Sequence, residues 1–172
     1  MTSNETQTFG VYVHVPFCAH RCDYCAFATY SDRDHLMVEY VNAVVQEISW
    51  ARDEGLPVAT SVFFGGGTPS RLPADQLVRI LDAIPRTVDA EVTVECNPED
   101  ASLGRLRAYR AGGVNRMSFG VQSTRPAVLA DLGPVSYTHL ASAHHRGVPR
   151  QRRSQPLRPM DRSVRRRAVD RS

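Results

Sequence analysis

The sequence has no lysine, one tryptophan and only four cysteines among its 172 residues. All 21 basic residues are therefore arginines, a bias to which we give no functional weight. Hydrophobic residues make up 42% and charged residues 23%, values that exclude a fully disordered chain and a disulfide-packed miniprotein. The chain is also too short for a complete eight-stranded βα barrel, which needs roughly 250 residues.

Targeting and membrane signals are missing as well. The first ten residues contain no basic stretch followed by an apolar one, so they do not form a secretory signal. No apolar run approaches the ~20 residues that span a membrane. We therefore expect a cytoplasmic protein. In that reducing compartment, clustered cysteines more often bind metal or react than form disulfides.

The net charge of +3 averages two unlike parts of the chain. Residues 1–133 hold 11 arginines against 16 acidic residues, a net −5, whereas residues 134–172 hold 10 against 2, a net +8. The second part has scarcely any apolar periodicity, so it cannot build a packed element. We expect a disordered N-terminus at 1–8, a folded core at 9–133 and a disordered basic tail at 134–172.

Short β-rich runs alternate with helical patterns through the expected core. The strands are predicted at 11–15, 61–64, 91–96 and 116–121. Apolar residues at helical spacing follow each strand, at 36–48, 73–84, 103–109 and from 126 onward. Ser31, Asp32 and Asp34 are available to cap the first helix. Four such βα units predict an α/β fold with parallel strands and right-handed crossovers.

Chemically distinctive residues stand where these strands end. They are a cysteine loop after the first strand, Gly65 to Gly67 after the second, Glu95 and Asn97 at the end of the third, and Gln122 after the fourth. Parallel sheets and barrels bind ligands at the carboxyl ends of their strands. We therefore predict one site at this edge of the sheet.

The cysteine loop is the strongest of these signals. Cys18, Cys22 and Cys25 have the spacing C-x3-C-x2-C, and three thiolates bind a soft metal well. A structural zinc ion needs a fourth ligand, which His14 or His20 could supply, so a Cys3His zinc module is one interpretation. An iron–sulfur cluster held by three thiolates instead keeps one iron open to a small molecule. The glycines favour the second interpretation, because their backbone can approach a ligand closely and offer amide and carbonyl groups.

Together these motifs resemble the radical S-adenosylmethionine superfamily, and within it the family of oxygen-independent coproporphyrinogen III oxidases and the heme chaperone HemW. The matching strings besides the cysteine loop are YVHVPFC from Tyr12, FFGGGTP from Phe63, VECNP from Val94 and GVNRMSFGVQS from Gly113. The resemblance implies that the folded core is the N-terminal part of a (β/α) barrel.

The resemblance also implies the cofactors. Cys18, Cys22 and Cys25 would ligate a [4Fe-4S] cluster whose open iron binds the amino and carboxylate groups of S-adenosylmethionine. An electron from the cluster would cleave that molecule to methionine and a 5′-deoxyadenosyl radical. The residues that would contact the bound cofactor are Tyr12, Gly66, Gly67, Thr68, Glu95 and Gln122. No residue is assigned to catalysis.

Position 27 distinguishes two activities within this family. The oxidases have a further cysteine two positions after the last cluster ligand, whereas this chain has Phe27. The difference favours a chaperone that binds heme and delivers it to hemoproteins over an enzyme that decarboxylates a tetrapyrrole. Heme or a porphyrin is the expected partner, with heme bound by the full-length protein. The electron donor and the recipient hemoprotein stay open, and nucleic acid is not expected.

The resemblance stops after Gly133. Pro134 stands where the family has an arginine near S-adenosylmethionine, and residues 135–140 resemble the product of one reading frame of a transposon end. The family's remaining strands and its His-Asn-x-x-Tyr-Trp motif do not follow. We therefore expect a chimeric or frameshifted tail rather than a natural basic arm for nucleic acid or membrane. A truncated barrel with exposed edges, inactive or prone to aggregate, is the consequence.

Overall fold

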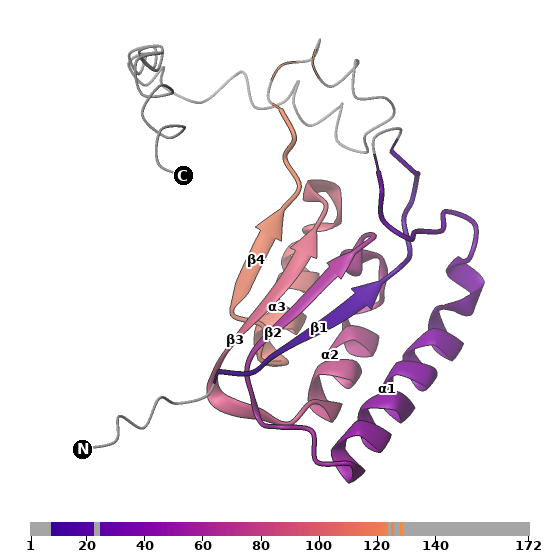
Figure 1. Cartoon of the computed structure of the whole chain (residues 1–172). Coiled ribbons are helices and arrows are strands. Elements are labelled where there is room, and N and C mark those ends of the chain that lie inside the picture. Colours follow the sequence, from indigo (N-terminus) through magenta and orange to yellow (C-terminus); the bar gives the residue numbers. More distant parts are fainter. Residues whose placement is uncertain (1–7, 23–24, 124, 126–127, 129–172) are drawn as a thin grey trace, which may run out of the picture.

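The computed structural model describes residues 8–22, 25–123, 125 and 128. Within them, four strands form one sheet in the order β1-β2-β3-β4, and every neighbouring pair is parallel (Figure 1). The strands are β1 (Gly10–Val15), β2 (Ala59–Gly66), β3 (Arg86–Cys96) and β4 (Arg116–Phe119). The predicted α/β fold with parallel βα units is therefore confirmed.

Three helices connect the strands and lie against one face of the sheet (Figure 1). They are α1 (Met37–Asp53), α2 (Ala74–Ala83) and α3 (Leu103–Ala111), preceded by the 3-10 turns η1 (Asp34–Leu36), η2 (Pro69–Arg71) and η3 (Pro98–Asp100). None of the helices described here has the length and apolar character needed to cross a bilayer. Of the predicted helix from residue 126, the structure describes only residue 128, which is helical, and the predicted tail at 134–172 lies outside the described residues.

The first helix begins differently from the sequence-based expectation. The chain enters α1 through η1, and neither the N-cap of η1 at Arg33 nor the N-cap of α1 at Leu36 carries a side-chain capping hydrogen bond. The expected cap by Ser31, Asp32 or Asp34 is therefore wrong. Asp34 instead forms an ion pair with Arg71 of η2. This long-range partner competes with the local role of the carboxylate, and a single sequence does not reveal it.

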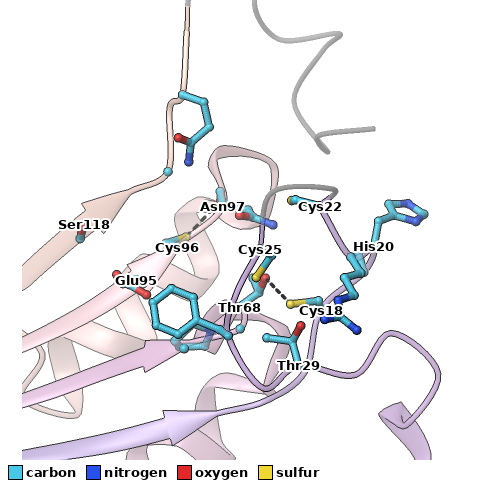
Figure 2. A pocket seen from close by; sticks show the side chains of 18 residues that line it. Cys18, His20, Cys22, Cys25, Thr29, Thr68, Glu95, Cys96, Asn97 and Ser118 are labelled. Carbon is cyan, nitrogen blue, oxygen red and sulfur yellow. Dashed lines mark hydrogen bonds between the residues drawn. The ribbon is translucent and has the colours of Figure 1, made fainter. Parts of the chain in front are cut away.

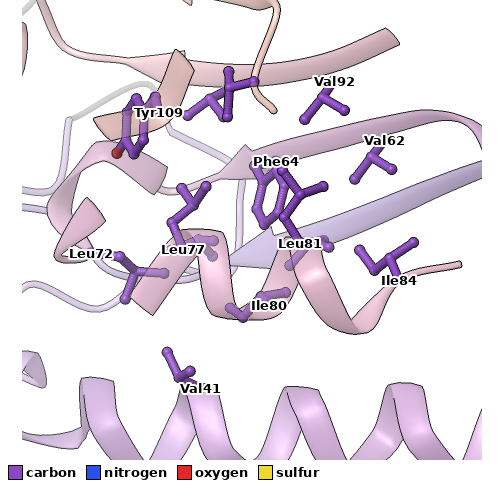
Figure 3. Close-up of a cluster of buried hydrophobic side chains, with 14 of the residues drawn as sticks. Val41, Val62, Phe64, Leu72, Leu77, Ile80, Leu81, Ile84, Val92 and Tyr109 are labelled. Atoms are coloured by element: carbon purple, nitrogen blue, oxygen red, sulfur yellow. The ribbon is translucent and has the colours of Figure 1, made fainter. Parts of the chain in front are cut away.

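The face of the sheet toward the helices forms the hydrophobic core (Figure 3). Alternate strand residues point into it, as the period of two in a strand requires. They are Val13, Val15, Val62, Phe64, Val92 and Val94. The helices contribute Val41, Leu77, Ile80, Leu81 and Tyr109. Because burial of each large apolar side chain is worth roughly 1.5–3 kcal/mol, this layer holds the strand ends in place.

The opposite face of the sheet is lined by aromatic and polar side chains. Tyr12 and Phe63 are paired in register and their rings stack at a centroid distance of 6.1 Å. Thr93 is the next partner along the same row, opposite Phe63. Tyr12 stays 53% exposed, so this face is open to solvent beside Tyr12 and leads up to the carboxyl ends of the strands.

Candidate functional site

A cavity of about 250 Å³ lies at the carboxyl edge of the sheet (Figure 2). Its walls come from the loop after β1, the end of β2 with η2, the end of β3 and the segment after β4. Eight of the predicted site residues line it: Cys18, Cys22, Cys25, Gly66, Gly67, Thr68, Glu95 and Gln122. The four strand ends thus converge on one cavity, as the sequence predicts. What these residues bind there stays a prediction.

The cysteine loop is closed at its base by backbone hydrogen bonds. The Cys18 amide donates to the Tyr30 carbonyl at 3.0 Å, and the Tyr30 amide donates to the Pro16 carbonyl at 2.8 Å. Within the loop, the Cys25 amide donates to the Cys22 carbonyl at 3.0 Å. All three thiols are free and partly buried. The loop therefore holds three thiols toward one cavity without a disulfide among them.

The Cys18 thiol has the most distinctive surroundings of the three. Burial raises its pKa, the Thr68 and Thr29 hydroxyls lower it, and the neighbouring Cys25 and Cys22 thiols raise it. The thiols are therefore close enough to influence one another electrostatically. In the described part of the chain, no three His, Cys, Asp or Glu side chains form a group that could hold a single metal ion, so the three thiols are not gathered around one atom as a zinc site requires.

Gly65 and Gly66 are the last residues of β2, and only Gly67 lies beyond the strand. Gly66 has a φ of +106°, and a Cβ atom there would collide with the His14 ring. A Cβ atom on Gly67 would lie 2.8 Å from the carbonyl oxygens of Val15 and Phe17. The glycines are therefore required first by the close approach of β1 and the loop after it.

The same approach occupies the backbone amides of this segment. The Gly67 amide donates to the Val15 carbonyl at 2.8 Å, and the Thr68 amide donates to the Phe17 carbonyl at 2.7 Å. The expectation that the glycines offer their amide groups to a ligand is therefore wrong for Gly67, and the Thr68 amide is engaged in the same way. Carbonyl oxygens and the Thr68 hydroxyl are the groups that could face a ligand here.

The end of β3 brings a carboxyl group to the cavity. Glu95 is half-buried, and burial raises the pKa of its carboxyl group, whereas a hydrogen bond with the Gly66 backbone lowers it. Cys96 is buried, and its thiol donates to the Asn97 carbonyl at 3.2 Å. Asn97 precedes η3, in agreement with the predicted turn. Gln122 lines the cavity from the segment after β4 and is exposed.

Three further candidates from the sequence are Tyr12, His14 and His20. Tyr12 lies on the open face of the sheet, outside the cavity lining, with its hydroxyl 3.2 Å from His14 Nδ1. His14 Nε2 lies 2.9 Å from the Ala28 carbonyl. Both ring nitrogens of His14 are therefore engaged. His20 lines the cavity, but its exposed ring points away from Cys18 and Cys25 (Figure 2).

Sequence reasoning missed two buried hydroxyls at the site. Ser70 is fully buried, and its Oγ donates to Asp100 Oδ2 at 2.6 Å and accepts from the Asn97 amide at 3.2 Å. Thr29 is only 8% exposed and lines the cavity. The one available signal for Thr29 is its position four residues after the last cysteine of the loop.

A family model described as the Radical SAM superfamily matches residues 12–146, which include every predicted site residue. The chain belongs to the radical SAM superfamily. The match extends beyond residue 133, where we predicted the folded core to end, and that boundary stays a prediction.

Two named proteins illustrate the similarity in sequence. The chain is 40% identical over 132 residues to the heme chaperone HemW of Bacillus subtilis, covering 73% of this chain and 35% of that protein. It is 42% identical over 138 residues to the mouse protein called radical S-adenosyl methionine domain-containing protein 1, mitochondrial, covering 77% and 30%. The predicted kinship with this group is confirmed.

A solved structure agrees with the fold. Coproporphyrinogen III oxidase (HemN) from Escherichia coli, described as a radical SAM enzyme, superposes with a TM-score of 0.65 at 31% identity, covering 73% of this chain and 30% of that one. The chain thus spans about a third of the length of the relatives it matches.

Proposed function

We propose that this chain is part of a HemW-like heme chaperone that binds a [4Fe-4S] cluster and S-adenosylmethionine and acts in heme delivery. The observation that carries the proposal is the position of Cys18, Cys22 and Cys25 on the wall of one cavity. The 40% identity to the Bacillus subtilis heme chaperone supports the heme-delivery part of the proposal. Heme or a porphyrin is the proposed partner, nucleic acid is not, and the proposed location is the cytoplasm.

The donor set of the cavity fits an iron–sulfur cluster. Three free, partly buried thiols come from one loop, and thiolates are the ligands that such clusters take. The Thr68 hydroxyl already donates to Cys18 Sγ at 3.7 Å. When bound, the cluster supplies the electron for reductive cleavage of S-adenosylmethionine. The three cysteines would hold the cluster in the cavity at the carboxyl edge of the sheet.

The remaining predicted contacts supply groups for S-adenosylmethionine. Glu95 offers a carboxylate that can accept hydrogen bonds from an ammonium or hydroxyl group, and Gln122 offers an amide. Gly66 and Gly67 offer carbonyl oxygens, because the Gly67 amide is already engaged with β1. Tyr12 would approach from the open face of the sheet. These groups bind and orient the cofactor, and none is proposed to transfer a proton.

The zinc module is the weaker interpretation. Its fourth ligand was to be His14 or His20, and both ring nitrogens of His14 already lie within hydrogen-bonding distance of other groups. The His20 ring points away from the cysteines (Figure 2). Either histidine would have to move before it could complete a tetrahedral Cys3His site.

Coproporphyrinogen oxidation is the second candidate function, favoured by the structural match to the Escherichia coli enzyme. Phe27 is exposed and lines the cavity where the oxidases are expected to have a cysteine. The two functions are separated by anaerobic assays of the reconstituted full-length protein with S-adenosylmethionine and a reductant. We expect a Soret absorbance from bound heme and no decarboxylation of coproporphyrinogen III. Sustained turnover would assign the oxidase activity, and an intact cluster without heme binding would contradict heme delivery.

A further inference from the structure

Two threonine hydroxyls lie beside the Cys18 thiol, and they come from different segments of the chain (Figure 2). Thr68 follows the glycines at the end of β2 and donates its hydroxyl to Cys18 Sγ at 3.7 Å. Thr29 ends the cysteine loop. Both side chains are at least nine-tenths buried, and both line the cavity. The function proposed above uses Thr68 as a cofactor contact and as a donor to Cys18, and it does not use Thr29.

The Thr29 hydroxyl is buried and has no hydrogen-bond partner among the residues that the structure describes. Buried hydroxyls nearly always have a partner, because an unpaired one costs the full desolvation penalty. The hydroxyl hydrogen can rotate to meet an acceptor. A hydrogen-bond acceptor placed at the cavity wall would therefore pair with the Thr29 hydroxyl and remove its desolvation penalty.

The sulfur of Cys18 is the nearby acceptor. Thr68 Oγ1 already donates to Cys18 Sγ at 3.7 Å, and the Thr29 side chain lies beside the same thiol (Figure 2). Within the described part of the chain, the side-chain hydrogen bonds to the three loop sulfurs involve Cys18 alone. A negatively charged sulfur is a stronger acceptor than a neutral thiol. Cys18 is thus distinguished from Cys22 and Cys25 by its donors.

We propose that Thr29 and Thr68 both donate hydrogen bonds to the Cys18 sulfur when it is a cluster ligand, and that they raise the reduction potential of the cluster. The inference rests on the [4Fe-4S] cluster of the proposed function. A reduced cluster carries one more negative charge than an oxidised one, so donors to its sulfurs stabilise the reduced form. Thr29 acts through Cys18 and is therefore a positioning residue rather than a catalytic one.

The test is an anaerobic redox titration of the reconstituted chain, followed by electron paramagnetic resonance. Thr29→Val replaces the hydroxyl with a methyl group of similar shape. At the potential where the wild-type cluster is half reduced, we expect the ratio of reduced to oxidised cluster to fall about tenfold in the variant. That ratio corresponds to a midpoint about 59 mV more negative for a one-electron couple. Thr68→Val is expected to shift the midpoint in the same direction.

Thr60→Val is the matched control. Thr60 lies on the same strand as the glycines but at its other end, where its Oγ1 donates to the Phe9 carbonyl at 3.1 Å. The substitution is chemically identical and remote from the cysteines. The wild-type midpoint is expected in this variant. A Thr29→Val midpoint equal to that of Thr60→Val overturns the proposal.

Thr29→Ser keeps the inference testable if Thr29→Val loads no cluster. The serine variant retains the donor and loses only a methyl group. Loading at the wild-type midpoint supports the role of the hydroxyl, and any other result for the serine variant contradicts it. A wild-type chain that binds no [4Fe-4S] cluster contradicts the proposed function itself. A loaded wild type with an unshifted Thr29→Val contradicts only the role of Thr29.

Discussion

Ser70 joins two loops of the site through a buried hydrogen bond from its Oγ to Asp100 Oδ2, 2.6 Å away. Asp100 is also paired with Arg105, whose Nη1 lies 3.5 Å from Oδ1. Ser70 belongs to η2, which follows Thr68, and Asp100 belongs to η3, which follows the end of β3. This network therefore fixes the end of β2 relative to the end of β3 at the cavity.

Removal of the Ser70 hydroxyl should destabilise the fold. Ser70→Ala leaves a carboxylate oxygen and the Asn97 amide without this partner, so we expect the free energy of unfolding to fall by about 1.5–3 kcal/mol. Urea denaturation followed by circular dichroism measures the change. Ser31→Ala, at an exposed position, is the control and should change the value by less than about 0.5 kcal/mol. Equal stabilities of the two variants would contradict the role of the network.

Two glycine-to-alanine substitutions should change the stability of the fold in opposite directions. Gly66→Ala introduces a Cβ atom against the His14 ring at a φ of +106°, so we expect a loss of more than about 1 kcal/mol. Gly104 lies in the first turn of α3 and has nothing within 4 Å of its missing Cβ. Gly104→Ala should therefore stabilise the protein by about 0.5 kcal/mol. Thermal unfolding of both variants tests the pair, and a stable Gly66→Ala protein would refute the close approach of β1.

Stability should fall at alkaline pH because of two tyrosines. Burial is the main cause that raises the pKa of Tyr40 and of Tyr109 to about 12, from an ordinary value of 10.0. Between pH 10 and 12 the unfolded chain releases these protons while the folded chain retains them. The free energy of unfolding should therefore be insensitive to these groups below pH 10 and decrease from pH 10 to 12.

Tyrosine-to-phenylalanine variants separate the two contributions. The Tyr109 hydroxyl is buried and has no hydrogen-bond partner among the described residues, so Tyr109→Phe should keep or slightly raise stability at pH 7. Tyr40 donates to the His14 carbonyl at 2.5 Å, so Tyr40→Phe should lose about 1 kcal/mol. Each variant should show a weaker alkaline decrease than the wild type. The free energy of unfolding is measured for all three proteins at pH 7, 10 and 11. An equal decrease in all three would show that neither tyrosine causes the alkaline loss of stability.

Replacement of Glu95 should weaken the binding of S-adenosylmethionine and leave the cluster in place. Glu95→Gln removes a half-buried carboxylate from the cavity, so we expect the affinity for S-adenosylmethionine to fall about tenfold, which one charged hydrogen bond explains. Iron content should be unchanged. Glu91→Gln is the matched control, because Glu91 lies on the same strand and pairs with Arg116 at the surface, away from the cavity. Calorimetric titration that gives equal affinities for both variants would remove Glu95 from the site.

Much of the fold could be predicted from the spacing of apolar residues along the sequence. The apolar residues of β1, β2 and β3 alternate or run together, and those of α2 recur at helical spacing, because each element buries one face in the same core. The convergence of the strand ends could also be predicted, because the carboxyl ends of parallel strands meet at one edge of a sheet. The cap of α1 could not be predicted, because Asp34 pairs with Arg71 from a distant segment.

Only part of the candidate site could be predicted from the sequence. The three cysteines are close in sequence, so their spacing already indicates a shared centre. The role of Gly66 and Gly67 depends on how closely β1 passes them, and the roles of Thr29 and Ser70 depend on partners brought near by folding. A single sequence contains no pattern for such contacts. The position of Tyr12 outside the cavity lining likewise depends on which face of β1 is open.

Metal analysis with electron paramagnetic resonance, on protein reconstituted without air, tests directly whether the three cysteines hold a cluster. We predict iron and sulfide in the ratio of a [4Fe-4S] cluster and a reduced-state signal that changes when S-adenosylmethionine is added. Cys18→Ser, Cys22→Ser and Cys25→Ser should each lose this signal, whereas Cys96→Ser, with its thiol on the Asn97 carbonyl, should keep it. A colourless protein with one tetrahedral zinc ion per chain would contradict the account.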